Sequence, residues 1–97
     1  MTFLCNAFSL QMIGEFPAMV EITEIPEPSK EELSSFDSAV GHNDTANVLG
    51  VACVRKNVKL NKDDTVIVAQ LTGGRLPEGS TTLPEGFSFK WLRVTLK

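Results

Sequence analysis

The chain has 97 residues, of which 42% are hydrophobic and 22% charged, and its formal net charge is −3 at pH 7. These proportions are ordinary for a globular protein and exclude a collagen-like, fibrous or disordered chain. The length predicts a single domain over residues 1–97. The acidic balance argues against general binding of DNA or RNA, and no apolar run approaches the roughly 20 residues that cross a bilayer. Because the N-terminus lacks a signal-peptide pattern, we expect a cytoplasmic protein without membrane contact.

The first part of the chain predicts two strands and a helix. Residues 2–8 are short and apolar, as in a strand, and residues 18–25 alternate as in a half-exposed strand. Between them, residues 9–16 predict an irregular or briefly helical link. A serine three positions before a glutamate forms a capping-box pattern, which predicts a helix over residues 29–36.

The middle of the chain predicts a second helix and then a pair of strands. Residues 40–45 read as a turn, and Asp44 is a natural N-cap for a helix over residues 45–52. Residues 58–60 and 65–71 are expected to be strands on either side of a polar turn.

The last part of the chain predicts a long loop and a final strand. Gly73 begins a glycine-containing loop, and residues 87–96 alternate between polar and apolar side chains. Together these elements predict the α+β class, with a mixed sheet flanked by short helices.

Charge is unevenly distributed along the chain. Residues 1–54 carry one basic and eight acidic side chains, whereas residues 55–97 carry eight basic and four acidic ones. A basic half can hold a compact anion even when the whole molecule is acidic. The alternative is that both sets form solvated faces.

His42 is the only histidine, so any histidine chemistry must use it. A single histidine is most often structural or simply exposed. This one follows Gly41, which permits close backbone approach, and it precedes a helix start, whose free N–H groups attract phosphate. Because imidazole titrates near neutral pH, His42 is a candidate general acid.

Other polar residues suit recognition of an anion. Asn6 and Ser9 follow the first strand and offer groups that can bond a base edge or a phosphate. Arg55 precedes the predicted strand pair, and Arg75 lies beside Glu78 in the long loop. Arginine is the side chain suited to bidentate phosphate recognition.

Metal, cofactor and thiol chemistry have no support in the sequence. The loop at Gly73 lacks the spacing and the lysine of a Walker motif. The carboxylates show no metal-ligand spacing, so we expect neither a metal nor a cofactor. Cys5 and Cys53 are far apart, and we expect both to be buried reduced thiols.

Four segments, taken in order and spacing, resemble the viral ring nucleases, also called type III anti-CRISPR proteins. They are residues 4–12, 40–45, 64–71 and 75–79. The resemblance implies a homodimer that binds one cyclic tetra-adenylate (cA4), the messenger of type III CRISPR immunity, across its two-fold axis. It further implies metal-independent cleavage to linear di-adenylate ending in 2′,3′-cyclic phosphate, in the host cytoplasm if the chain is viral.

The resemblance also implies roles for individual residues. His42 falls on the family's catalytic histidine and Glu78 on its loop glutamate, which either orients a neighbour or acts as a base. The residues expected to bind the ligand are Asn6, Ser9, Gln11, Asp44, Thr45, Arg55, Gln70 and Arg75. Lys56 competes with Arg55 for its role, because the alignment there needs a one-residue gap. Asp44 departs from the family's serine and puts a carboxylate near the ligand.

Two other functions are compatible with the same residues. A non-cleaving sponge would bind the cyclic oligonucleotide with the same pocket, and only the geometry of His42 separates it from a nuclease. A small protein-interaction module would instead use an edge strand or an apolar patch, and it would have no affinity for cyclic nucleotides.

Overall fold

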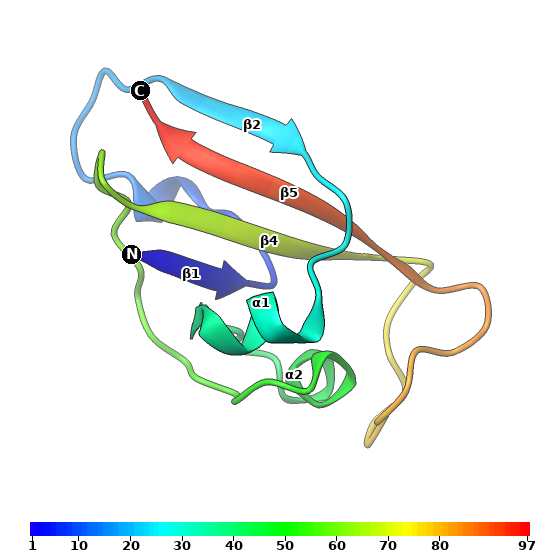
Figure 1. Ribbon diagram of the computed structural model, residues 1–97. Coiled ribbons are helices and arrows are strands. Elements are labelled where there is room, and N and C mark those ends of the chain that lie inside the picture. The colour runs from blue at the N-terminus through cyan, green and yellow to red at the C-terminus, as the bar shows by residue number, and fades with distance from the viewer.

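Five strands form one mixed sheet in the computed structural model, which describes all 97 residues. Figure 1 shows the longer strands as arrows. The strands are β1 (Thr2–Cys5), β2 (Val20–Glu24), β3 (Asp37–Ser38), β4 (Thr65–Thr72) and β5 (Ser88–Leu96). The helices are the 3₁₀ turn η1 (Leu10–Met12), α1 (Lys30–Ser35) and α2 (Asn43–Leu49). The expected α+β class, with a mixed sheet and short helices, is confirmed. None of the helices has the length and apolar character that crossing a membrane would require.

The sheet has the order β2-β5-β4-β1-β3. Strand β1 is parallel to both of its neighbours, β3 and β4, whereas β5 is antiparallel to β4 and to β2. The carboxyl ends of β1, β3 and β4 therefore meet at one edge of the sheet, and the chain segments that follow β1 and β3 emerge there together.

Both faces of the central strand β4 are buried, because the sheet is covered on each side. On one face, Ile67 and Ala69 pack with Leu4 and Trp91 beneath the helical segments. On the other face, the core consists of Cys5, Val58, Leu60, Val66, Val68 and Val94. The alternating side chains of β4 thus divide one small domain between two apolar layers.

The expected strand over residues 58–60 is wrong. Val58 and Leu60 are buried, but they belong to an irregular segment that lies across the sheet instead of pairing within it. The Leu60 N–H donates to the Met12 carbonyl at 2.7 Å, which joins this segment to η1. β4 forms its hairpin with β5 instead. The alternation of Val58 and Leu60 therefore reflects contact with the core and not a ladder of hydrogen bonds.

The capping box predicted for the first helix is confirmed. The Ser29 hydroxyl accepts the Glu32 N–H at 3.1 Å, and the Glu32 carboxylate accepts the Ser29 N–H at 3.1 Å. The expectation of two buried thiols is wrong in part, because Cys5 is buried whereas Cys53 is exposed.

Candidate functional site

The candidate site lies where the chain leaves the parallel strands. Asn6 follows β1 directly, and Gly41 and His42 follow β3 and the short bridge at Val40. The Asn6 side-chain oxygen accepts the Gly41 N–H at 3.3 Å. In open sheets, ligands bind outside the carboxyl ends of parallel strands. This hydrogen bond therefore holds the His42 turn at the edge of the sheet where a ligand site is expected.

His42, and not Asp44, is the N-cap of α2. The helix begins at Asn43, two residues earlier than predicted, and His42 has the extended backbone of a cap residue. Its Nδ1 accepts the Thr45 N–H at 3.3 Å and lies 3.1 Å from the Thr45 hydroxyl oxygen. The cap therefore fixes the ring through Nδ1, whereas Nε2 of the exposed His42 forms no hydrogen bond within the chain.

Arg55 lies directly against the His42 turn. Its Nε donates to the Gly41 carbonyl at 3.0 Å. A Cβ on Gly41 would lie 3.4 Å from the Arg55 Cγ, so the glycine makes this close approach possible. The terminal nitrogens of the exposed guanidinium have no partner within the chain and are available for an anion.

Lys56, the competitor of Arg55, is occupied elsewhere. Its Nζ lies 2.7 Å from an Asp37 carboxylate oxygen and 5.5 Å from the centre of the Phe3 ring. Of the two adjacent bases, Arg55 is the one that contacts the His42 turn.

The long loop between β4 and β5 reaches the same region. The Asp44 carboxylate, in the first turn of α2, accepts the Gly79 N–H at 3.1 Å. Arg75 and Glu78 are exposed, whereas Leu76 between them is only 5% exposed. The loop thus presents its arginine and glutamate to solvent while a buried leucine anchors it.

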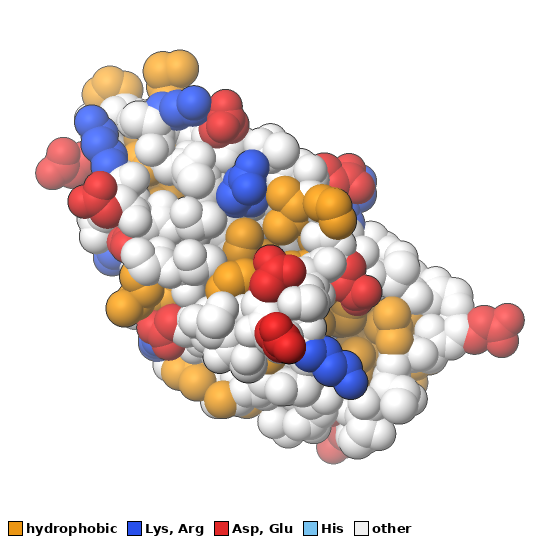
Figure 2. All heavy atoms as spheres, viewed as in Figure 1, with side chains coloured by type: hydrophobic (Ala, Val, Ile, Leu, Met, Phe, Trp, Pro, Cys, Tyr) orange, Lys and Arg blue, Asp and Glu red, His pale blue; other side chains and the backbone are white.

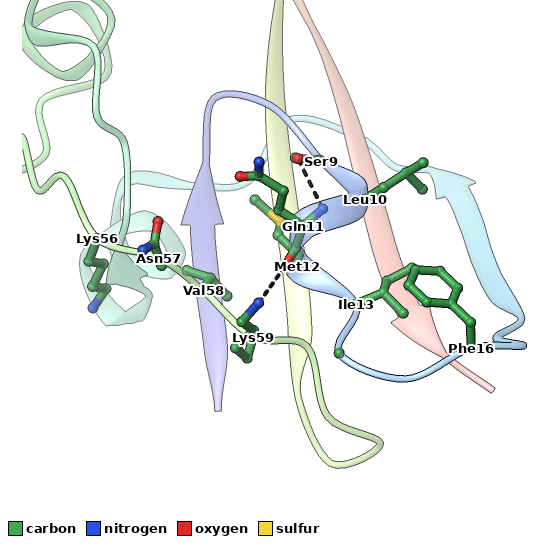
Figure 3. Close-up of a pocket in the computed structure, with 11 residues that line it drawn as sticks. Ser9, Leu10, Gln11, Met12, Ile13, Phe16, Lys56, Asn57, Val58 and Lys59 are labelled. Atoms are coloured by element: carbon green, nitrogen blue, oxygen red, sulfur yellow. Dashed lines mark hydrogen bonds between the residues drawn. The ribbon is translucent and has the colours of Figure 1, made fainter.

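The remaining predicted residues lie apart from His42. Ser9 caps η1, where its hydroxyl accepts the Gln11 N–H at 3.2 Å. Both residues line the largest cavity, of about 630 Å³, which lies between residues 9–16 and 56–59 (Figure 3). Lys59 closes this cavity on one side by donating to the Gln11 carbonyl at 2.7 Å. Neither His42 nor the long loop contributes to the cavity lining.

Gln70 is exposed on β4, opposite Lys90 of β5. It follows Val66 and Val68 on the same face of the sheet, which is the face that η1 and residues 58–60 cover. Gln70 therefore belongs to the side of the molecule that carries Ser9 and Gln11. The chain therefore divides the predicted residues between a cluster around His42 and the side of the molecule that carries the cavity around Ser9.

Ion pairs between distant segments partly offset the charge asymmetry of the sequence. Acidic and basic side chains are interspersed on the face that Figure 2 shows. The pairing of β2 with β5 brings the Glu21 carboxylate within 3.1 Å of Lys97 Nζ, and a separate contact brings the Asp37 carboxylate of β3 within 2.7 Å of Lys56 Nζ. Pairing between distant segments therefore mixes the charges of the two halves, and any anion site must be local.

The structure contains no cluster of metal ligands, and the buried Cys5 thiol is not reactive. No three His, Cys, Asp or Glu side chains lie close enough together to hold a metal ion. Burial raises the pKa of the Cys5 thiol to about 11, and the nearby Lys56 charge opposes this only in part. At neutral pH this thiol is protonated and unreactive.

The family model named STIV B116-like matches residues 2–88. The chain belongs to this family. Among solved structures it is similar to B116 of Sulfolobus turreted icosahedral virus (STIV), with 25% sequence identity over 97% of both chains and a TM-score of 0.73. No curated protein matches the chain significantly. The STIV B116-like chain therefore shares its fold, over almost its whole length, with a viral protein.

Proposed function

We propose that this STIV B116-like protein is a metal-independent ring nuclease that switches off type III CRISPR signalling. It binds cA4 and cleaves it to linear di-adenylate ending in 2′,3′-cyclic phosphate. The observation that carries the proposal is the exposed His42 side chain, whose ring is held through Nδ1, directly after Gly41, whose carbonyl binds Arg55. The identity of the ligand is inferred from the resemblance of the surrounding segments to the ring nucleases.

The reaction uses a nucleophile that the RNA itself carries. The 2′-hydroxyl oxygen attacks the adjacent phosphorus and gives up its proton to solvent water, the bond from phosphorus to the 5′-oxygen breaks, and a 2′,3′-cyclic phosphate forms. The departing 5′-oxygen takes a proton from Nε2 of His42. General acid catalysis of this kind contributes about 10²- to 10⁴-fold in rate. Holding the 2′-oxygen in line with the leaving oxygen lowers the activation free energy of cleavage further.

Thr45 gives the His42 ring a partner in both protonation states. In the neutral ring with its proton on Nε2, Nδ1 accepts the Thr45 N–H. In the imidazolium, Nδ1 carries a proton and donates to the Thr45 hydroxyl oxygen, 3.1 Å away. The ring therefore keeps its orientation when it is charged, and Nε2–H remains directed outward as the acid.

The neighbouring residues stabilise charge on the phosphoryl oxygens and hold the ring. Arg55 and Arg75 offset the developing negative charge, as preorganised donors do in many active sites. Glu78 orients Arg75 or a ribose hydroxyl. Ser9, Gln11 and Gln70 hold adenine or ribose on the other side of the molecule.

Two protomers explain how these separate clusters serve one ligand. Each chain has one histidine and therefore one acid for one scissile bond. A two-fold dimer matches the symmetry of a four-membered ring, and two acids cut opposite linkages to release two di-adenylates. The partner also brings a second copy of the cavity around Ser9 to the shared ligand.

The test is cleavage of cA4 by the purified protein in the presence of EDTA, with products identified by mass. We expect di-adenylate with 2′,3′-cyclic phosphate. His42→Asn is the sharpest variant, because an asparagine oxygen can still cap α2 but cannot donate a proton as an acid. It should bind cA4 and cleave about 10²- to 10⁴-fold more slowly. Asn43→Ala, next to it, is the matched control and should retain activity.

A non-cleaving sponge is the second candidate, and the cap at His42 favours it. A histidine that accepts a backbone N–H through Nδ1 already has a structural role. Intact cA4 recovered from a tight complex after long incubation would establish the sponge and reject the nuclease.

A further inference from the structure

The loop of residues 73–87 is closed at its base and only lightly attached elsewhere. A Cβ on Gly73 would lie 2.5 Å from the Gly86 carbonyl oxygen, so the two ends of the loop are in direct contact. Just outside it, the Thr72 hydroxyl bonds to the Ser88 carbonyl at 3.0 Å. A compact loop with adjoining ends is held in place by its own side chains and by its few contacts with the body of the protein.

Inside this loop, a turn places the Gly79 N–H outward. The Ser80 N–H and hydroxyl both bond to the Pro77 carbonyl, at 3.2 and 2.6 Å. Gly79 has φ +79°, the left-handed region that favours glycine. Its N–H then meets the Asp44 carboxylate at 3.1 Å, which is the only hydrogen bond between residues 73–87 and the rest of the protein.

From this geometry we infer that Asp44 is a positioning residue that ties the loop carrying Arg75 and Glu78 to the first turn of α2, beside His42. This inference rests on the proposed function. It gives the Asp44 carboxylate the role of holding the loop and not of binding the ligand. The tie needs an acceptor oxygen and not a charge, so asparagine can replace Asp44. The remaining negative charge repels an anionic ligand, and removing it strengthens binding.

The first arm of the test needs no ligand. Amide hydrogen exchange at Gly79, followed by NMR, is slow in the wild type and in Asp44→Asn, and about tenfold faster in Asp44→Ala. Asn47→Ala, which removes an exposed polar side chain one turn along the same helix, leaves the exchange unchanged. Alanine has the highest helix propensity, so α2 persists in both alanine variants, as circular dichroism would verify.

The second arm is cleavage of cA4. Asp44→Ala lowers kcat about tenfold, because the loop leaves its productive position for most of the time. Asp44→Asn keeps kcat, because the loop stays tied, and lowers KM, because the repelling charge is gone. A residue with a merely structural role would not change KM alone. Gly79 exchange that is equally slow in Asp44→Ala and wild type would overturn the inference. Absence of cleavage by every form would reject the proposed nuclease, while the exchange arm would still decide whether Asp44 holds the loop.

Discussion

The Nδ1 atom of His42 combines two tasks that proteins usually assign to different residues. It caps the N-terminus of α2 with a hydrogen bond, and it fixes the orientation of the imidazole ring. The sequence indicated His42 as a candidate because it is the only histidine, but it did not indicate the cap. Asp44 is a stronger N-cap by type. The tie between Asp44 and Gly79, 35 residues away, engages that carboxylate in the folded chain.

The buried Cys5 thiol makes the unfolding free energy of the protein fall as pH rises in the alkaline range. In the folded state, burial raises the pKa of its thiol from 9.0 to about 11, whereas the unfolded chain exposes it. Because the folded pKa is the higher one, the thiol's contribution is full below pH 9 and is lost as pH rises toward 11. We expect the difference in unfolding free energy between wild type and Cys5→Ala to shrink over that interval, as measured by urea denaturation.

Cys53→Ala is the matched control for this measurement, since Cys53 is exposed. It should follow the wild-type pH profile throughout. A difference between wild type and Cys5→Ala that stays constant up to pH 11 would contradict the link between burial and ionisation.

At the scale of elements, the regular strands and the first helix were predictable, whereas the cap of α2 and the segments that cover the sheet were not. The strands around β1, β2, β4 and β5 and the helix after Ser29 follow from alternation and from a capping box, which are local signals. β3 has only two residues and exists because Phe3 and Leu4 offer it a partner. No local pattern encodes that contact.

The cluster at the site was predictable only in its composition. Residue types singled out Arg55, Arg75 and His42, but sequence spacing could not separate Arg55 from Lys56. That choice rests on Asp37 and Phe3, which engage the lysine through contacts between distant segments.

The segment around Leu60 contributes to the core although it is not a strand. Leu60 is 3% exposed and packs against the β4 and β5 side chains. We expect Leu60→Ala to lower the unfolding free energy by about 2–5 kcal/mol, because it leaves a cavity in a closely packed layer. Thermal and urea unfolding would measure this.

Leu83→Ala provides the comparison, because Leu83 is 37% exposed in the long loop. Its unfolding free energy should change by no more than about 0.5 kcal/mol. Equal effects of the two substitutions would show that the irregular segment does not contribute to the core.

At the scale of the whole molecule, the proposed function predicts a defined stoichiometry. One cA4 bound per two chains is expected from calorimetric titration of the His42→Asn variant, because the proposal places the ligand on a two-fold axis. Light scattering should give twice the chain mass of 10.6 kDa. One ligand per chain, on a monomer, would contradict the shared site.

The register of the sheet also determines where the two chain termini lie. Thr2 pairs with Thr65, and Thr65 pairs with Thr95, so Met1 and Lys97 lie at the same end of the sheet (Figure 1). The carboxyl end of β1, which leads to Asn6 and the His42 turn, is at the opposite end. An affinity tag, a fluorophore or a surface linker can therefore be attached at either terminus without obstructing access to the imidazole.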